Sequence, residues 1–317
     1  MGKKYFLLFL LICIVAASQI GCFELNKKTI RVGTNIWPGY ETLHLAKHLG
    51  FIPNNIKLIE LMSATDVMEA FRLNRLEVAA LTMDEAMTLV AEGIDLSVFL
   101  VMDVSNGGDK LIARADIIKL PDLKGKTIAY EQTALGALML HEVMHASELN
   151  IEDVTLVHLK INQQLEAFAN GSVDALITFE PVATQLLQFN GEVIFDSSHI
   201  PNTIVDVLVA RKDTLRNHRN LIKILVNGQS KALSAIADSR TMSLEIMSKR
   251  MGLTAEQLNI AMRGIHYPSI IENQTLLKSN SDLYDTVERL NAILFNANII
   301  DRPVDPNLFF DDTFVKP

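Results

Sequence analysis

One stretch of the sequence has the spacing of a catalytic metal site. His141-Glu142-Val143-Met144-His145 matches the pattern H-E-x-x-H, in which two histidines one helical turn apart bind zinc and the glutamate activates water. The pattern begins about seven residues into a predicted helix, 134–149, so it would lie ~10 Å from the helix end nearest a binding crevice. We therefore expect a solvated helix face here and at the similar pair His44 and His48, and keep a zinc metallopeptidase as a remote alternative.

A second set of residues could bind a ligand, because each follows or ends a predicted strand. In a parallel α/β sheet the carboxyl ends of the strands line the binding crevice. The acidic and aromatic residues at these ends are Trp37, Tyr40, Asp84, Asp109, Glu131, Glu180 and Asp206. Lys110 is the only lysine at these ends, and no arginine occurs there. An alternative, strongest for Glu85, is that some of the acids cap helix N-termini.

The charge of this set predicts the chemistry of the ligand. Desolvating nitrate or a sulfonate beside carboxylates would cost on the order of several kcal/mol. An amine, amidine or aminopyrimidine would instead satisfy the acidic oxygens, while Trp37 and Tyr40 stack on it. We expect a small neutral-to-cationic ligand. The sequence has no Gly-rich phosphate loop, G-x-S-x-G turn or cysteine nucleophile, so we expect no enzyme activity, no metal and no cofactor.

Predicted strands and helices alternate along most of the chain, which indicates sheets with both faces covered. The first strand begins at Ile30, breaks at Trp37-Pro38-Gly39 and leads into a helix. The strands that follow are predicted at 57–61, 78–82, 96–102, 109–113, 127–130, 154–159 and 173–179. The helices between and after them are predicted at 65–73, 84–92, 134–149, 163–170 and 182–189, and the chain is mainly helical beyond Asn217.

Two parts of the sequence repeat each other at long range. Residues 68–71 recur as 165–168, and residues 77–85 recur as 174–181, at a spacing of about 97 residues. This spacing is too long for a solenoid and fits two similar lobes. The segments 109–114 and 204–211 share the order Asp, apolar residues, Ala, Arg, and we predict that they are crossover strands between the lobes.

The first strand–helix unit, the repeated blocks and the paired crossovers resemble periplasmic solute-binding proteins of ABC importers, in the branch that binds nitrate, sulfonates and thiamine pyrimidines. The resemblance covers about residues 28–300. It implies a two-lobed type II α/β fold, with a mostly parallel sheet flanked by helices in each lobe and a two-strand hinge. Lobe 1 would comprise 28–110 and 207–300, and lobe 2 would comprise 111–206.

The same resemblance implies a monomer that delivers a small-molecule ligand to an inner-membrane ABC permease. A ligand-sensing subunit of a membrane signalling receptor is the alternative, because it needs the same hinge. The chain has 317 residues, 49% of them hydrophobic, which is enough for two domains. Its net charge of −8 and its lack of a Lys/Arg run argue against a nucleic-acid partner.

Residues 1–21 have the features of a secretory signal peptide. Two lysines precede an apolar run of about 12 residues, which is too short to span a bilayer. The run leads to Gln19-Ile20-Gly21-Cys22, which resembles a lipoprotein processing site, although Gln19 stands where leucine is usual. After cleavage Cys22 would be the only cysteine, which excludes an intramolecular disulfide and favours lipidation over an unused thiol. We therefore expect a membrane-anchored periplasmic lipoprotein.

Overall fold

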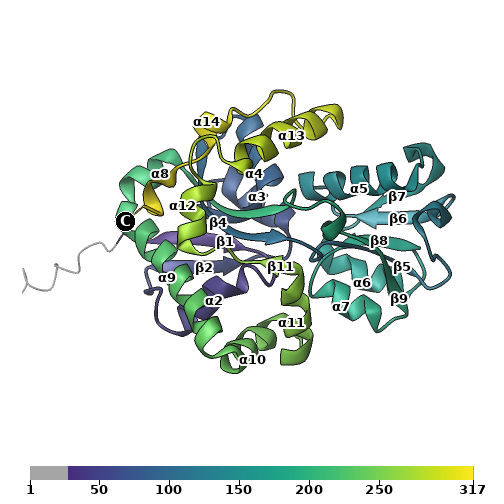
Figure 1. Ribbon diagram of the computed structural model, residues 1–317, viewed down its shortest axis with the longest axis horizontal. Coiled ribbons are helices and arrows are strands. Elements are labelled where there is room, and N and C mark those ends of the chain that lie inside the picture. Colours follow the sequence, from purple (N-terminus) through teal and green to yellow (C-terminus); the bar gives the residue numbers. More distant parts are fainter. Residues whose placement is uncertain (1–27, 317) are drawn as a thin grey trace, which may run out of the picture.

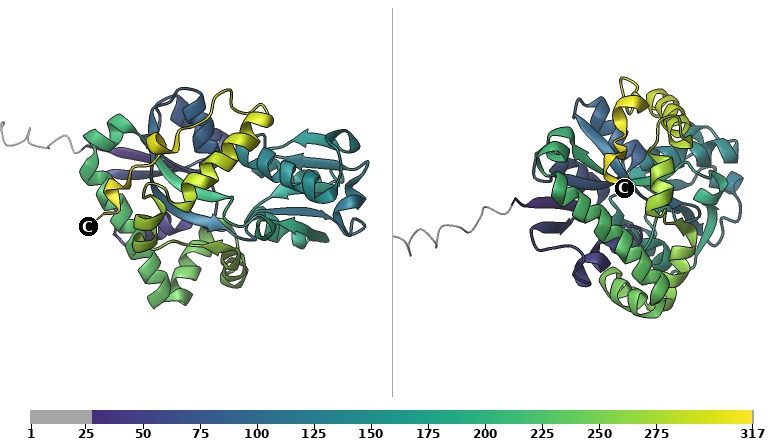
Figure 2. Two further views of the ribbon diagram at one scale, coloured as in Figure 1. Left: turned by 45° about the horizontal axis from the view of Figure 1, so that its top comes forward. Right: turned by 60° about the vertical axis from the view of Figure 1, so that its left-hand side comes forward.

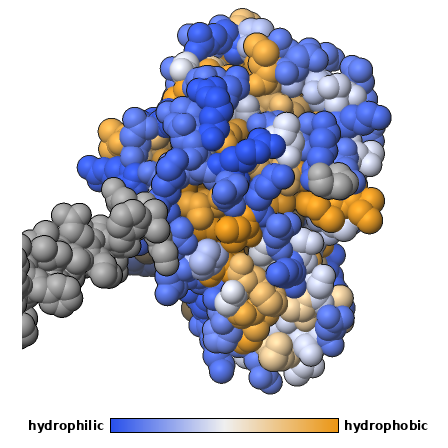
Figure 3. Space-filling view, turned by 90° about the vertical axis from the view of Figure 1, so that its left-hand side faces the viewer, coloured by the Kyte–Doolittle hydropathy of each residue, from blue (hydrophilic) through white to orange (hydrophobic). Residues whose placement is uncertain are grey.

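The structure, a computed structural model, describes residues 28–316 and has two lobes, each built around one β-sheet (Figure 1). The predicted signal peptide and Cys22 lie outside the described residues. Both ends of the described chain lie on the larger lobe, away from the smaller one (Figure 2). Polar residues cover much of that remote face, with apolar groups between them (Figure 3). Within residues 28–316, no helix is long and apolar enough to cross a membrane.

The larger lobe contains a six-stranded sheet. Its strands, in spatial order, are β11 (Ile265–His266), β4 (Leu96–Ser105), β10 (Val205–Arg211), β3 (Val78–Thr82), β1 (Ile30–Thr34) and β2 (Ile56–Glu60). The α-helices of this lobe are α2 (Glu41–His48), α3 (Ala64–Arg72), α4 (Met83–Ala91), α8 (Lys212–Asn217), α9 (Arg219–Asp238), α10 (Arg240–Met251), α11 (Ala255–Ala261), α12 (Ile270–Leu276), α13 (Asp282–Asn296) and α14 (Pro306–Phe309). Every residue of β3 is buried, as expected for a strand with both faces covered.

The smaller lobe contains a five-stranded sheet. Its strands, in spatial order, are β7 (Thr155–His158), β6 (Thr127–Tyr130), β8 (Ala175–Thr178), β5 (Lys110–Arg114) and β9 (Gly191–Asp196). Three α-helices flank it: α5 (Ala134–Ser147), α6 (Ile161–Ala169) and α7 (Val182–Leu187). Phe168 on α6 is 1% exposed and belongs to a compact apolar cluster with Leu176 on β8 and Leu186 on α7. The α/β class and the two-lobed arrangement predicted from sequence are thus confirmed.

The pairing within the sheets refines the expectation of mostly parallel strands. β1 is parallel to β2 and β3, and β6 is parallel to β7 and β8. β10 is antiparallel to β3 and β4, and β5 is antiparallel to β8 and β9. Both sheets are therefore mixed, because the strand that follows each connection between the lobes, β5 or β10, runs antiparallel to both of its neighbours.

The two connections between the lobes run beside each other. The first lies between β4 and β5, and the second between β9 and β10. Ser105 Oγ lies 2.8 Å from Ser197 Oγ, which also accepts a hydrogen bond of 2.7 Å from the Gly107 amide. The predicted crossover strands, 109–114 and 204–211, are real but belong to different sheets. The chain therefore passes between the lobes in the short segments 106–109 and 197–204. That these segments act as the hinge, and the lobe boundaries given above, stay predictions.

Candidate functional site

A narrow cleft between the lobes brings most of the predicted strand-end residues together. It contains two neighbouring cavities with a free volume of about 20 Å³ each. Ala64, Glu85, Asp109, Leu135 and Phe179 line both cavities. The first cavity is also lined by Asn35, Trp37, Tyr40, Thr82 and Asp206, and the second by Glu131, Thr133, Gly136, Gln164, Ile177 and Thr178. Residues from both lobes thus enclose one polar site, as expected for a ligand held between two domains.

Trp37 connects the two lobes at this site. It lies in the turn between β1 and α2 and is 4% exposed. Its indole Nε1 donates to the two carboxylate oxygens of Asp103, at 3.2 and 3.3 Å. Its ring meets Phe179 of the smaller lobe edge to face, with centroids 5.8 Å apart. A Cβ at Gly39 would lie 1.8 Å from Asp103 Oδ2, so this turn needs glycine to approach the carboxylate.

Asp103 and Asp206 form a buried acidic pair beneath Trp37 and Tyr40. The two residues lie opposite each other on β4 and β10, and Tyr40 Oη donates a short hydrogen bond to Asp206 Oδ1. Burial raises the pKa of Asp103 to about 7. Burial and the charge of Asp103 raise the pKa of Asp206 well above its usual range. Burial and the charge of each carboxylate on the other thus both favour the protonated form of the pair.

Glu85 combines the two roles that the sequence left open. Its Oε2 accepts a hydrogen bond of 3.1 Å from the Thr82 amide, which caps α4. Its Oε1 is buried and has no hydrogen-bond partner among the described residues. Burial, together with the charge of Asp84, raises the pKa of Glu85 to about 8. Asp84 lies next to it outside the cavity lining, with both oxygens unpartnered and its pKa raised to about 6 by burial.

The smaller lobe contributes three acceptors. Glu131 Oε1 accepts hydrogen bonds from Thr65, whereas its Oε2 is buried and unpartnered. Gln164 Nε2 donates to the Ile177 carbonyl at 3.2 Å, which leaves Oε1 buried without a partner within residues 28–316. The Thr178 hydroxyl is also buried and has no hydrogen-bond partner within the same residues. Sequence reasoning missed Gln164 and Thr178, although Thr178 is the counterpart of Thr82 in the long-range repeat.

Asp109 and Glu180 have different positions in the site. Asp109 lines both cavities, and burial raises its pKa to about 6. Glu180 lies outside the cavity lining: its Oε1 is 3.3 Å from Lys110 Nζ, and its Oε2 caps α7 through the Thr184 amide at 3.0 Å. Of the predicted ligand-binding residues, the structure therefore places Trp37, Tyr40, Asp109, Glu131 and Asp206 at the cavities, and Asp84 and Glu180 beside them.

The H-E-x-x-H stretch lies on α5, outside the lining of either cavity. His141 and His145 are exposed and Glu142 is half-buried. Within the described chain, no third residue completes a group of possible metal ligands with these histidines. The structure thus brings this motif neither to the cleft nor to a metal-binding arrangement.

The fold and the enclosed cleft define a protein of the two-lobed periplasmic binding protein class. A family model described as NMT1/THI5 like matches residues 43–240, which is more than half of the chain. The chain therefore belongs to the NMT1/THI5-like family. This membership confirms the resemblance that the sequence blocks indicated.

Individual relatives are distant in sequence but close in fold. The taurine-binding periplasmic protein of Escherichia coli is 23% identical over 164 residues, and the match spans 51% of each protein, about half the length of that relative. The periplasmic aliphatic sulphonate binding protein SsuA of E. coli shares 18% identity at a TM-score of 0.71, covering 90% of this chain and 98% of that one. SsuA of Xanthomonas axonopodis pv. citri, an alkanesulfonate-binding protein bound to MOPS, shares 15% identity at a TM-score of 0.72, covering 89% of this chain and 98% of that one.

Proposed function

We propose that this protein is the solute-binding component of an ABC importer. It captures a small neutral-to-cationic ligand, of an amine or aminopyrimidine type, between its two lobes in the periplasm. The closed form then presents the ligand to an inner-membrane permease. Membership in the NMT1/THI5-like family and the similarity to a periplasmic taurine-binding protein support this role.

One observation carries the ligand class: the unpartnered polar atoms buried at the cavities are all oxygens. The free oxygens of Glu85, Glu131 and Gln164 can only accept while the two acids are ionised, and the hydroxyls of Thr82 and Thr178 can do both. A buried acceptor without a partner costs about 1–3 kcal/mol. A ligand with several N–H donors satisfies these atoms, and a positive charge on it strengthens each bond.

The same set of atoms disfavours an anion. No lysine, arginine or histidine of the described chain lines either cavity. The nearby Lys110 is already paired with Glu180. A sulfonate or nitrate would bring further acceptors and negative charge to a site rich in both. The proposed ligand therefore differs in charge from the sulfonates named for the relatives.

Calorimetry with a ligand panel tests the proposal. Amines, amidines and aminopyrimidines are titrated against alkyl sulfonates and nitrate. We expect binding only from the first group, and we expect Glu85→Gln to weaken it by about 1.5–3 kcal/mol through loss of a charge-assisted hydrogen bond. Glu142→Gln, on α5 away from the cavities, is the control and should bind as the parent does. Tight binding of a sulfonate that is insensitive to Glu85→Gln would overturn the ligand class.

The membrane tether is a separate part of the proposal, because Cys22 lies outside the described residues. Lipidation of Cys22 would hold the binding protein close to the permease. Several acyl chains, at about 0.8 kcal/mol per buried CH₂, would anchor it stably. Membrane fractionation of cells that express Cys22→Ala checks this: we expect release into the soluble periplasmic fraction. Equal membrane association of the variant would contradict the lipid anchor.

A further inference from the structure

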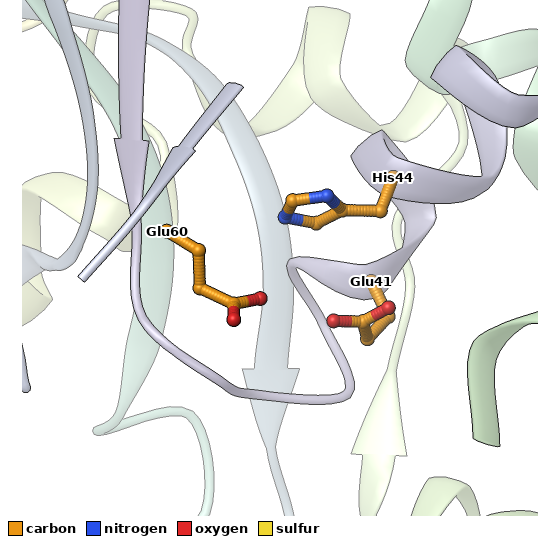
Figure 4. Close-up of side chains that lie close together, drawn as sticks. All are labelled: Glu41, His44 and Glu60. Atoms are coloured by element: carbon orange, nitrogen blue, oxygen red, sulfur yellow. The ribbon is translucent and has the colours of Figure 1, made fainter. Parts of the chain in front are cut away.

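A cluster of possible metal ligands lies in the larger lobe, outside the lining of the cleft. Glu41 and His44 lie one turn apart at the start of α2, and Glu60 ends β2 (Figure 4). One ligand atom from each of the three lies within 4.8 Å of the other two. In a tetrahedral zinc site with bonds of about 2.0–2.1 Å, two ligand atoms lie about 3.3 Å apart, so these side chains would have to approach one another by at most about 1.5 Å to coordinate the ion.

His44 departs from the solvated position expected for it, whereas its neighbour does not. His44 is half-buried, with Nε2 lying 3.2 Å from the Thr34 hydroxyl at the end of β1, while His48 is exposed. The ring is therefore held towards the two carboxylates by β1 and α2. Imidazole with carboxylate oxygens is a ligand set of zinc and related transition metals, whereas calcium takes six to eight oxygens.

A cationic side chain, Arg250, already lies between the members of the cluster. Arg250 Nε lies 3.0 Å from Glu41 Oε2, its Nη2 forms a short ion pair with Glu60, and the same Nη2 lies 3.5 Å from His44 Nε2. One guanidinium offsets only one of the two negative charges, and Glu41 is 1% exposed. A dication would offset both charges and would use the imidazole as a third ligand.

We propose that Glu41, His44 and Glu60 form a binding site for a divalent transition-metal ion such as Zn²⁺, and that Arg250 occupies this site when the metal is absent. Metal and guanidinium exclude each other, because both need the same carboxylate oxygens. The three protein ligands leave a fourth coordination position for water.

The surroundings give Arg250 a place to move. Its side chain is 36% exposed and borders an open groove of about 870 Å³ between α2, β2 and α10. The groove is also lined by Lys57 and Lys249, so a second cation does not enter beside Arg250 but has to replace it. Removal of the guanidinium should therefore strengthen metal binding.

Competition with a chromogenic zinc chelator, on EDTA-treated protein without cleft ligand, tests the site. We expect one zinc ion per chain. His44→Ala and Glu60→Gln should each weaken binding at least about 10-fold, and Arg250→Gln should strengthen it by a similar factor. Cobalt(II) gives a second measurement: its visible absorption should change on binding to the parent chain and not to His44→Ala.

Two controls separate this site from other histidines. His48→Ala, on the same helix, and the double variant His141→Ala with His145→Ala should bind zinc as the parent does. Circular dichroism checks that every variant is folded. Glu60 is substituted in place of Glu41, because Glu41 is buried and its replacement would disturb the fold. The proposal is overturned if neither the parent nor Arg250→Gln binds zinc, or if His44→Ala and Glu60→Gln bind it unchanged.

Discussion

Thr65 and Glu131 lie on different lobes and are joined by hydrogen bonds across the cleft. Glu131 Oε1 accepts from the Thr65 hydroxyl at 2.5 Å and from the Thr65 amide at 3.2 Å. The other oxygen of Glu131 is buried at the cavity without a partner. One carboxylate therefore bridges the lobes and keeps a free oxygen at the cavity, and we propose that a ligand that binds this oxygen favours closure.

Substitutions at this pair should separate closure from ligand contact. Thr65→Val removes the hydroxyl bond and keeps the amide bond, so we expect ligand affinity to fall by about 1–2 kcal/mol as the closed state becomes less populated. Glu131→Gln also weakens the contact with a cationic ligand, so ligand affinity should fall further in this variant than in Thr65→Val. Calorimetry measures both affinities. Equal affinity in Thr65→Val and the parent would show that the bond does not contribute to closure.

A second contact between the lobes should contribute less. Lys160 Nζ lies 2.7 Å from Asp66 Oδ1, with side chains 43% and 34% exposed. Such an exposed pair is worth about 0.2–1 kcal/mol and is screened by salt. A double-mutant cycle with Lys160→Ala and Asp66→Ala, read as ligand affinity at low and high salt, should give a small coupling that disappears at high salt. A coupling that persists in high salt would contradict this assignment.

The buried acids predict how stability depends on pH. Burial raises the pKa of Glu85 from 4.5 to about 8, and that of Asp103 from 3.8 to about 7. At a pH between the unfolded and the folded pKa of each residue, the folded state then binds more protons than the unfolded state. The free energy of unfolding of the ligand-free protein should therefore fall as pH rises from about 4.5 to about 8, by on the order of a few kcal/mol. Denaturant unfolding across this range measures the change, and a rise in stability would contradict it.

The same protons should oppose a cationic ligand. Because protonated Glu85 presents a neutral group, the ligand's positive charge has to displace its proton. Affinity should therefore increase between about pH 6 and pH 8, the interval set by the raised pKa values of Asp109 and Glu85. Calorimetry in buffers of different ionisation enthalpy should detect proton release on binding. Glu85→Gln should release fewer protons, and an unchanged number would exclude Glu85 as their source.

Trp37 allows stacking and hydrogen bonding to be tested separately. Trp37→Phe keeps an aromatic ring against Phe179 but removes the donor to Asp103. Trp37→Ala removes both, and we expect it to weaken ligand binding by about 1–2 kcal/mol through lost stacking. Trp37→Phe should bind more tightly than Trp37→Ala. Thermal unfolding is measured alongside, and a folded Trp37→Ala variant with parental affinity would exclude a stacking role.

The sequence determined the class of fold and the acidic character of the cleft. Strand and helix periodicities specify alternating elements, because burial of one face requires apolar residues at fixed spacing. The long-range repeat also has a structural counterpart. Arg211 lies over the ring of Phe71 and donates to its carbonyl at 2.7 Å, and Arg114 has the same relationship with Phe168. The local residue pattern and the long-range repeat were thus sufficient to predict the fold class and the two similar lobes.

Only the tertiary structure decided which acids face the cavities and which are already paired. Glu180 looks equivalent to Glu131 in sequence, but it lies against Lys110, 70 residues away along the chain. His44 looks equivalent to His48, but Arg250 approaches it from α10, 206 residues away along the chain. The partner of a polar side chain depends on distances between segments that meet only on folding, so the spacing of residues along the chain does not contain it.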